Sequence, residues 1–461
     1  MVGDYLKMGN IRVLFLSLLF VSCHLQRKGD VLISNTNIID IETGKVFKGD
    51  VLVKDSVILT ISKPNTISFH DLQFIDGTDH YLIPGLWDMH VHIQDSTYLS
   101  MFLDYGVTGV RDMGGCVNIP TDGCESVCPE ILNRWKVAME EDLMNGPTLF
   151  IAGTQLSGTG WPTSLPVATR EEVTNAFRQN LQDQVDFIKV YEEIPWESYQ
   201  EIARLAKQHH LDFVGHVSEP FLLSDILDLG QKSIEHIREP LVYSFTDDPA
   251  ELEDFMVADG YTEDDRQFVQ PWIEDANNVI ESFKKNQAWF TPTMAVQYAR
   301  LRFQDTQWIA HPERKRMPAS VNEGMNQHLM RMKNSRDYEG DLLWWQALTK
   351  LVKRFSNENI GLLAGSDAAC EGGIPGYSLH EELILMVEEA RLSPLGALQT
   401  AIINPCTYFG LKYNGKIQDG YCADLVLLKE NPLENIRNIH SIKAVFKKGK
   451  VVRFAQENSS N

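Results

Sequence analysis

The sequence is poor in basic residues, has no internal repeat, and has no apolar run long enough to span a bilayer as a helix. It contains 42 Lys and Arg against 63 Asp and Glu, a net charge of −21 over 461 residues. This shortage of positive charge argues against nucleic-acid binding, because few cations are available to neutralise phosphates. Hydrophobic residues make up 43% and charged residues 23%, which is typical of a globular protein with a large core.

The N-terminus has the features of an export signal. Lys7 and Arg12 precede the apolar run 13–21, which ends at Ser22-Cys23. A basic start followed by a short apolar run is typical of a signal peptide, here residues 1–23. The small residue before Cys23 resembles the bacterial lipoprotein box, which predicts a periplasmic or cell-envelope protein anchored by a lipid on Cys23. That lipid would be the only attachment to a membrane. The alternatives are a cleaved soluble export signal or an apolar N-terminal helix.

The other cysteines do not have the paired spacing of a zinc ribbon. Cys116, Cys124 and Cys128 lie close together in the sequence, whereas Cys370, Cys406 and Cys422 are scattered. In an exported chain the close group could hold one disulfide within a loop. The spacing leaves the pairing open.

The two ends of the chain have the same β-rich texture around a mixed centre. β-branched residues occur in short runs broken by turn residues, both early and late in the sequence. This pattern predicts a small composite β-sandwich formed by residues 30–83 and 408–456. The length left for the centre, 84–407, suits a barrel of roughly 250 residues with insertions.

The centre alternates short apolar strands with helical stretches, which favours a parallel sheet with helical crossovers. Eight strands are expected, at Leu82–His92, Val107–Met113, Thr148–Thr154, Phe187–Tyr191, Asp212–Val217, Ser233–Ile237, Trp289–Thr293 and Ile360–Asp367. Eight strand–helix units close a barrel, so the fold class is α/β with a (β/α)₈ TIM-like barrel. The long gaps before Trp289 and before Ile360 are expected to be helical insertions near the barrel mouth.

Polar residues with metal-binding potential stand at the carboxyl ends of several expected strands. His90 and His92 alternate along the first strand, so both face the barrel interior and can share a metal. Lys189 lies within an apolar strand, where a buried ammonium is costly. Protonated lysine has no lone pair, but a carbamate formed with CO₂ offers two oxygens that can bridge two metals. The structural alternatives are paired polar side chains and a lysine whose head reaches solvent.

Each of three later strands adds one polar residue that could bind a metal. His216 ends the fifth strand, His236 lies near the end of the sixth, and Asp367 ends the eighth. Taken singly, each histidine is better explained as a hydrogen-bonded core residue, and Asp367 as a helix N-cap. Six such residues at the ends of strands one, four, five, six and eight form a more specific pattern, and barrel enzymes place their reactive groups at these ends.

With these motifs the chain resembles the amidohydrolase superfamily, in particular its imidazolonepropionase-like and carboxylated-lysine prolidase-like branch. Further shared motifs are Gly106–Asp112 on strand two, His380-Glu381-Glu382-Leu383 on a late helix, and Asn404-Pro405. The sequence departs from the family pattern at Arg391, where relatives often have glycine, and in the segment from Cys116 to Cys128, which looks inserted. Neither departure touches the ligands.

The resemblance implies a binuclear metal site. His90, His92 and Asp367 would bind the first divalent metal, His216 and His236 the second, and carboxylated Lys189 would bridge the two. Zinc suits imidazole and carboxylate ligands, although manganese and iron remain open.

The ligand set predicts a metal-dependent hydrolase that cleaves a C–N bond in a small amide, cyclic amide or dipeptide. The nucleophile would be a hydroxide bridging the metals, because two dications lower the pKa of a shared water. Asp367 would shuttle the proton to the leaving amine. Tyr191 could donate to a substrate carboxylate or tetrahedral oxygen, or pack at the barrel rim. A homo-oligomer would agree with the resemblance.

Two other functions remain open from the sequence. A single-metal deaminase acting on a heterocycle would need only one metal and would release ammonia. A non-catalytic exported binding protein would keep the barrel as a scaffold, although the intact ligand types argue against it.

Overall fold

The structure is a computed structural model. It describes residues 30–67, 72–116, 124–158, 163–218, 221–236, 276–335 and 338–455, and the side chains of 332–335, 339, 340 and 343 are not described. The expected signal peptide and its Cys23 lie outside these residues, as does the end of the expected sixth strand at Ile237. Among the helices of the described ranges, none combines the length and the apolar character that a membrane span requires.

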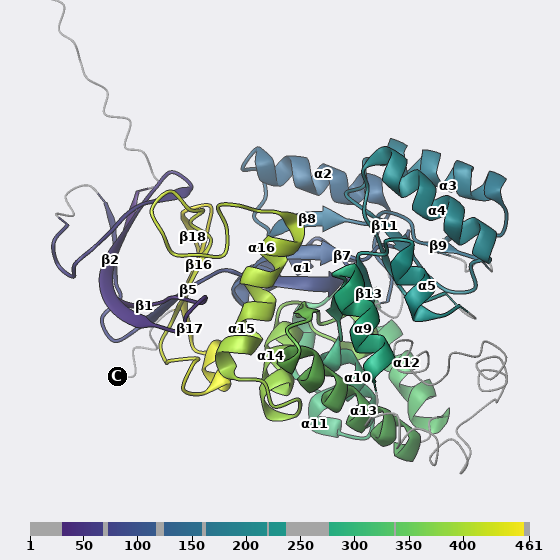
Figure 1. The fold of residues 1–461 in the computed structure, drawn as a ribbon. Coiled ribbons are helices and arrows are strands. Elements are labelled where there is room, and N and C mark those ends of the chain that lie inside the picture. The colour runs from purple at the N-terminus through teal and green to yellow at the C-terminus, as the bar shows by residue number, and fades with distance from the viewer. Residues whose placement is uncertain are drawn as a thin grey trace, which may run out of the picture.

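Strands from both ends of the chain form one sheet, at the left of Figure 1. The early strands are β1 (Val31–Ile39), β2 (Val46–Lys54), β3 (Val57–Ser62), β4 (Gln73–Asp76) and β5 (Tyr81–Pro84). The late strands are β16 (Leu425–Leu428), β17 (Ile442–Lys447) and β18 (Lys450–Phe454). Their order is β18-β17-β16-β5-β1-β2-β3, with β4 beside β1, and β5 pairs antiparallel with β16. The alternating apolar residues of these strands share a core of their own, so the expected association of the two ends is present as a single sheet.

The centre consists of parallel strands, as expected for an α/β protein. One sheet contains β6 (Leu86–Val91), β7 (Val107–Asp112) and β8 (Thr148–Ile151). The other runs β10-β9-β11-β12-β13-β14-β15. Its strands are β9 (Leu156–Ser157), β10 (Leu165–Pro166), β11 (Ile188–Val190), β12 (Phe213–Gly215), β13 (Ser233–Glu235), β14 (Trp289–Thr291) and β15 (Gly361–Leu362). A strand lies within each of the eight expected ranges, and all pairings in these two sheets are parallel.

Backbone hydrogen bonds link the two central sheets on both sides. Asp186 N donates to Ile151 O at 2.9 Å, which joins the end of β8 to the chain entering β11. On the other side, Met89 N donates to Ala364 O at 2.8 Å and His92 N to Ala368 O at 2.7 Å. The segment after β15 therefore runs beside β6.

The expected first strand, Leu82–His92, is corrected to two strands. β5 belongs to the terminal sheet and β6 to the centre, with Gly85 between them. A Cβ atom at Gly85 would lie 2.1 Å from Thr108 Oγ1, so no larger residue fits where the chain crosses β7. Apolar residues on both sides of Pro84-Gly85 concealed this break, because both strands are buried.

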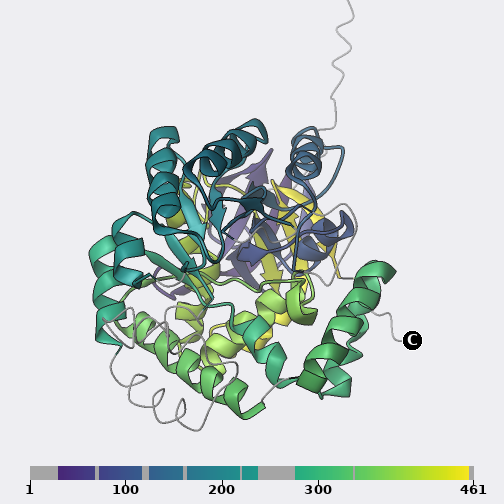
Figure 2. The same ribbon diagram turned by 90° about the vertical axis from the view of Figure 1, so that its right-hand side faces the viewer.

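Helices surround the central strands (Figure 2). Before β14, the described helices are α1 (Thr97–Asp104), α2 (Pro129–Glu140), α3 (Arg170–Gln182), α4 (Trp196–His209), α5 (Leu223–Asp228) and α9 (Asn277–Asn286). The expected insertion before β15 is helical, with α10 (Met294–Leu301), α11 (Thr306–Ile309), η1 (Pro312–Arg316), α12 (Ala319–Ser335) and α13 (Tyr338–Asn357). Then follow η2 (Cys370–Gly372), α14 (Tyr377–Glu388), α15 (Pro394–Ala401), α16 (Ile403–Phe409) and η3 (Ile436–His440).

The disulfides differ from the single loop bridge that was expected. Cys116 bonds to Cys128, and Cys124 bonds to Cys370, which is 246 residues away in the sequence. The second bond forms because the fold brings the chain after β15 beside the loop that follows β7. Of the described cysteines, Cys406 and Cys422 are free.

Candidate metal centre

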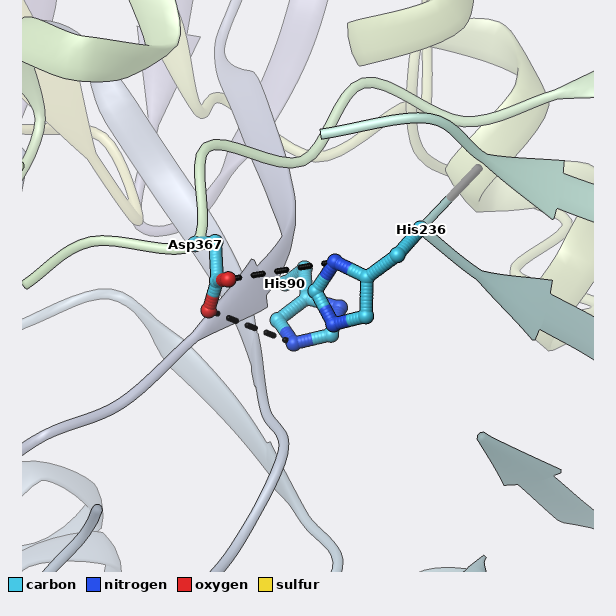
Figure 3. A group of neighbouring side chains, drawn as sticks. All are labelled: His90, His236 and Asp367. Atoms are coloured by element: carbon cyan, nitrogen blue, oxygen red, sulfur yellow. Dashed lines mark ion pairs between the residues drawn. The ribbon is translucent and has the colours of Figure 1, made fainter. Parts of the chain in front are cut away.

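Three side chains from different strands converge at the carboxyl ends of the central strands. His90 is on β6, His236 follows β13, and Asp367 follows β15; their ligand atoms all lie within 4.8 Å of one another. Figure 3 shows the three side chains pointing toward one another. His90 Nε2 lies 3.4 Å from Asp367 Oδ1, and His236 Nδ1 lies 3.8 Å from Asp367 Oδ2.

The structure brings the other expected ligands to the same place. His92 Nε2 lies 3.5 Å from Asp367 Oδ1. The ring centroid of His216 lies 4.9 Å from that of His236. Lys189 lies on β11, next to the strand β12 that His216 follows, and is 2% exposed. Its charge contributes to lowering the pKa of His90, His92 and Asp367. The six residues expected from the sequence are therefore all gathered at the carboxyl ends of the central strands.

Three of the histidines are oriented by a hydrogen-bond acceptor next to their Nδ1 atom. His90 Nδ1 lies 3.0 Å from Glu235 Oε2, and His92 Nδ1 lies 3.0 Å from Gly114 O. His216 Nδ1 lies 3.2 Å from Glu192 Oε1. Carboxylate and carbonyl oxygens only accept, so each Nδ1–H donates and each Nε2 keeps its lone pair. His236 Nδ1 lies 2.8 Å from the hydroxyl of Thr293. Fixing the tautomer through the second nitrogen is a regular feature of metal-binding histidines.

Burial keeps the imidazoles of His90, His92 and His236 neutral. Loss of solvent, with the charge of Lys189 next in size, lowers the pKa of His92 to about 3. The pKa of His90 and that of His236 are lowered well below the usual range, again chiefly by burial. Burial raises the pKa of Asp367 to about 8, against the lowering effect of Lys189. Neutral imidazoles can bind a cation without first losing a proton.

The donor set fits a metal ion. Among the described residues, His90 Nε2 and Asp367 Oδ1 are buried atoms without a hydrogen-bond partner, and they face each other in the cluster. Leaving two such atoms buried and unsatisfied is unfavourable, whereas a shared cation would satisfy both. Imidazole nitrogen and carboxylate oxygen are suitable ligands for zinc and related divalent metals.

A second layer of buried charges, whose roles the sequence did not reveal, supports the ligands. Glu235 accepts from His90 and forms an ion pair with Arg111, Nη2 to Oε2 at 2.7 Å, with all three side chains fully buried. Asp88 accepts from Ser366 Oγ at 2.5 Å and Ser366 N at 2.9 Å, directly before Asp367. The signal in the sequence was the presence of charged residues inside apolar strands, since such charges stay buried only when paired.

Glu235 precedes His236, yet both face the cluster. Strict strand alternation would turn neighbouring side chains to opposite faces. His236 has φ of 66°, which ends β13 in the left-handed region and breaks the alternation.

Tyr191 lies directly after β11, with its ring centroid 4.3 Å from that of His216. Its position at the strand end agrees with either a substrate contact or rim packing. His380, in the shared motif of α14, hydrogen-bonds to Tyr105 O at 2.8 Å and to His440 Nδ1 at 3.0 Å.

We predict that Glu235→Gln weakens metal binding about 10- to 100-fold, the usual effect of altering a residue that orients a ligand histidine. A neutral amide polarises His90 less than a carboxylate does. Competition with a chelator measures the affinity, and near-ultraviolet circular dichroism checks the fold. Glu388→Gln, which alters the exposed ion pair with Arg437, is the control. A metal affinity within twofold of the wild type would mean that Glu235 does not orient His90 and serves only the ion pair with Arg111.

Comparisons with known proteins agree with this geometry. The model of the Amidohydrolase family matches residues 345–452. A dihydroorotase from Carboxydothermus hydrogenoformans is 44% identical over 68 residues, and an adenine deaminase from Halalkalibacterium halodurans is 34% identical over 90. These matches cover 15% and 18% of this chain, and the chain spans only 15% of the length of each of these relatives.

Similarity of the fold extends over nearly the whole chain. The crystal structure of a Xaa-Pro dipeptidase with bound methionine in the active site superposes with a TM-score of 0.61 and 18% identity. The superposition covers 92% of this chain and 99% of the dipeptidase chain. The protein is therefore an α/β protein with a TIM-barrel-like fold. Together with the family model, this match confirms the resemblance to the amidohydrolases.

Proposed function

We propose that this protein is a metal-dependent hydrolase that cleaves a C–N bond in a small amide, cyclic amide or dipeptide. The observation that carries the proposal is the convergence of His90, His236 and Asp367, in which the buried atoms His90 Nε2 and Asp367 Oδ1 face each other without a hydrogen-bond partner. The similarity to a dihydroorotase, an adenine deaminase and a Xaa-Pro dipeptidase supports the class of reaction.

The proposed site holds two divalent metals, with zinc as the first choice. His90, His92 and Asp367 would hold one metal, His216 and His236 the other, and a CO₂-derived carbamate on Lys189 would bridge them. When bound, the metals lower the pKa of a water and polarise the substrate carbonyl. The burial of Lys189 supports the carbamate, because a buried ammonium is costly and has no lone pair for a cation, whereas the charge of a carbamate would be compensated by the metals that it binds.

The chain itself supplies proton transfer and orientation. Asp367 would accept a proton from the attacking water and pass it to the leaving amine, because its carboxylate lies at the centre of the cluster. Tyr191, on the same strand end as Lys189, would donate its hydroxyl to a carboxylate or oxyanion of the substrate. Glu235 and Asp88 would hold His90 and the Asp367 backbone in place.

We further infer that the central strands close into a (β/α)₈ barrel over 84–407 and that the terminal sheet, 30–83 with 408–456, folds as a small sandwich. The hydrogen bonds of Asp186 and Met89, which link the two central sheets on opposite sides, support closure.

The alternative function is a single-metal deaminase of a heterocycle, which the similarity to an adenine deaminase favours. The position of Lys189 separates the two, because a one-metal site does not need a bridging carbamate. Ammonia release from heterocyclic amines would identify the deaminase directly.

The first test is the number of metals per chain, and we expect about two. Protein produced without residues 1–23 in the presence of zinc and bicarbonate would be analysed by plasma mass spectrometry. Lys189→Ala should lower the number to about one, because the bridging ligand is lost. Lys136→Ala, which alters a partly exposed pair with Asp186, should leave it unchanged.

Each outcome has a consequence for the proposal. About one metal in the wild type, unchanged by Lys189→Ala, would put the deaminase first. No metal at all would contradict both enzymes and favour the exported binding protein. About two metals would direct substrate screening to dipeptides and cyclic amides.

A further inference from the structure

One disulfide connects the two chain segments that carry proposed ligands of the first metal. Cys124 lies in the loop between β7 and α2, and Cys370 lies three residues after Asp367. The other disulfide, Cys116–Cys128, stays within the loop after β7 and closes a separation of 12 residues. Only Cys124–Cys370, of the two disulfides in the described residues, therefore joins two distant segments of the chain.

On one side, the segment of Cys124 is attached to the chain that follows His92. Ser126 Oγ donates to Asp112 Oδ2 at 2.7 Å and accepts from Ile93 N at 3.1 Å. Val127 N donates to Ile93 O at 2.9 Å. A displacement of residues 124–127 would therefore be transmitted to the end of β6, next to His92.

On the other side, the segment of Cys370 is attached to Asp367. Cys370 N donates to Asp367 O at 2.8 Å. The adjacent Glu371, 5% exposed, has Oε2 3.0 Å from His328 Nε2 and Oε1 3.4 Å from Arg300 Nη2. Glu371 therefore connects the segment that follows Asp367 to α12 and α10 of the insertion.

The backbone between these contacts is unfavourable for ordinary residues. Asp367 has φ of 56° and Glu371 has φ of 50°, both in the left-handed region that non-glycine residues rarely occupy. Such conformations persist where the surrounding structure leaves no alternative. Cys370 lies between them, so its covalent bond restrains the stretch in which both conformations occur.

We propose that Cys124–Cys370 is a positioning element that holds Asp367 beside His92, so that both side chains can bind the same metal. This inference rests on the proposed metal site, but it assigns a function to the segment from Cys116 to Cys128 that the family pattern lacks. Backbone hydrogen bonds from His92 N to Ala368 O at 2.7 Å and from Asp367 N to His90 O at 2.8 Å also join these segments, so opening the bond would loosen the Asp367 segment without detaching it. Asp367 would then hold the first metal less firmly, while His216 and His236 would be unaffected.

The test compares the Cys124→Ser/Cys370→Ser variant with the Cys116→Ser/Cys128→Ser variant. Gly114, whose carbonyl orients His92, is held by Asp112, and Gly115 by Gly153, so the second variant serves as a matched control. Zinc per chain is counted after dialysis, affinity is measured by chelator competition, and near-ultraviolet circular dichroism checks the fold. The visible absorption spectrum of cobalt-substituted protein reports the ligand geometry, which a purely structural bond would leave unchanged.

We expect the first variant to bind one of its two metals about 10- to 100-fold more weakly, with an altered cobalt spectrum, and the control to match the wild type. Wild type with two metals and a first variant with unchanged affinity and spectrum would overturn the positioning role and leave the proposed function standing. Equal losses in both variants would also overturn it, because the cause would then be general disorder of the loop. Wild type without metal would instead contradict the proposed function.

If the first variant does not fold, the control variant provides a second measurement. Of the disulfides in the described residues it retains only Cys124–Cys370. A phosphine with water reduces this bond to two thiols and becomes the phosphine oxide, so the folded, zinc-loaded protein can be opened at this bond. Release of zinc to a chelator at least tenfold faster after reduction supports the proposal, and an unchanged rate overturns it.

Discussion

Asp367→Asn is expected to lower turnover by a factor of about 10² or more at saturating metal, because the variant loses the proposed proton acceptor. Asp367 Oδ1 lies 3.4 Å from His90 Nε2 and 3.5 Å from His92 Nε2, within the proposed metal site. Asparagine keeps the shape and one oxygen that can bind a cation. It has no basic site, so the proton of the attacking water cannot pass to the leaving amine.

The measurement is the rate of substrate cleavage together with metal content, since both metals should remain bound to Asp367→Asn. Asp228→Asn is the control, because Asp228 lies at the end of α5 in a surface pair with Lys285. Near-normal turnover of Asp367→Asn with full metal content would remove Asp367 from proton transfer. A loss of metal equal to the loss of turnover would make Asp367 a ligand only.

The arrangement of the centre was predictable because short apolar strands alternate with helical stretches along the sequence. A strand lies in every one of the eight expected ranges. The split of Leu82–His92 into β5 and β6 was missed because both strands are fully or nearly buried, although the turn pair Pro84-Gly85 stands at the break. The close approach of Gly85 to Thr108 marks the crossing in the structure.

The positions of the candidate ligands were predictable for a topological reason. Residues at the carboxyl ends of parallel strands meet at one edge of the sheet, so His90, His216 and Asp367 come together whatever the intervening loops contain. Contacts away from that edge were not predictable. The bond between Cys124 and Cys370 depends on how two distant loops pack, and sequence spacing carries no information about it.

The role of Arg111 also depends on contacts between distant segments, which the sequence does not predict. The sequence places it on an apolar strand within a shared motif, but its partners come from four other segments of the chain. Its guanidinium donates to Met89 O, Ser233 Oγ, Tyr408 Oη, Thr291 Oγ1 and both oxygens of Glu235, at distances from 2.6 to 3.2 Å. Burial disfavours the charge, but Glu235 and Tyr408 raise the net pKa of Arg111 above its ordinary value.

Arg111→Met is expected to lower the free energy of unfolding of the metal-free protein by about 3–5 kcal/mol, the usual cost of removing one partner of a buried ion pair. Glu235 would remain fully buried with its charge uncompensated. Denaturation by urea, followed by circular dichroism, measures the change. Arg204→Met, which removes an exposed pair with Glu201 on α4, should have little effect.

A double variant separates the ion pair from the loss of packing. Glu235→Gln removes the uncompensated charge, so Arg111→Met/Glu235→Gln should be less destabilised than the sum of the two single variants. Additive losses would mean that Arg111 acts mainly through Met89, Ser233 and Tyr408. A favourable coupling would instead mean that the ion pair joining β7 to β13 itself stabilises the fold and holds Glu235 in place beside His90. The same buried charge would then stabilise the strands and fix the position of a proposed metal ligand.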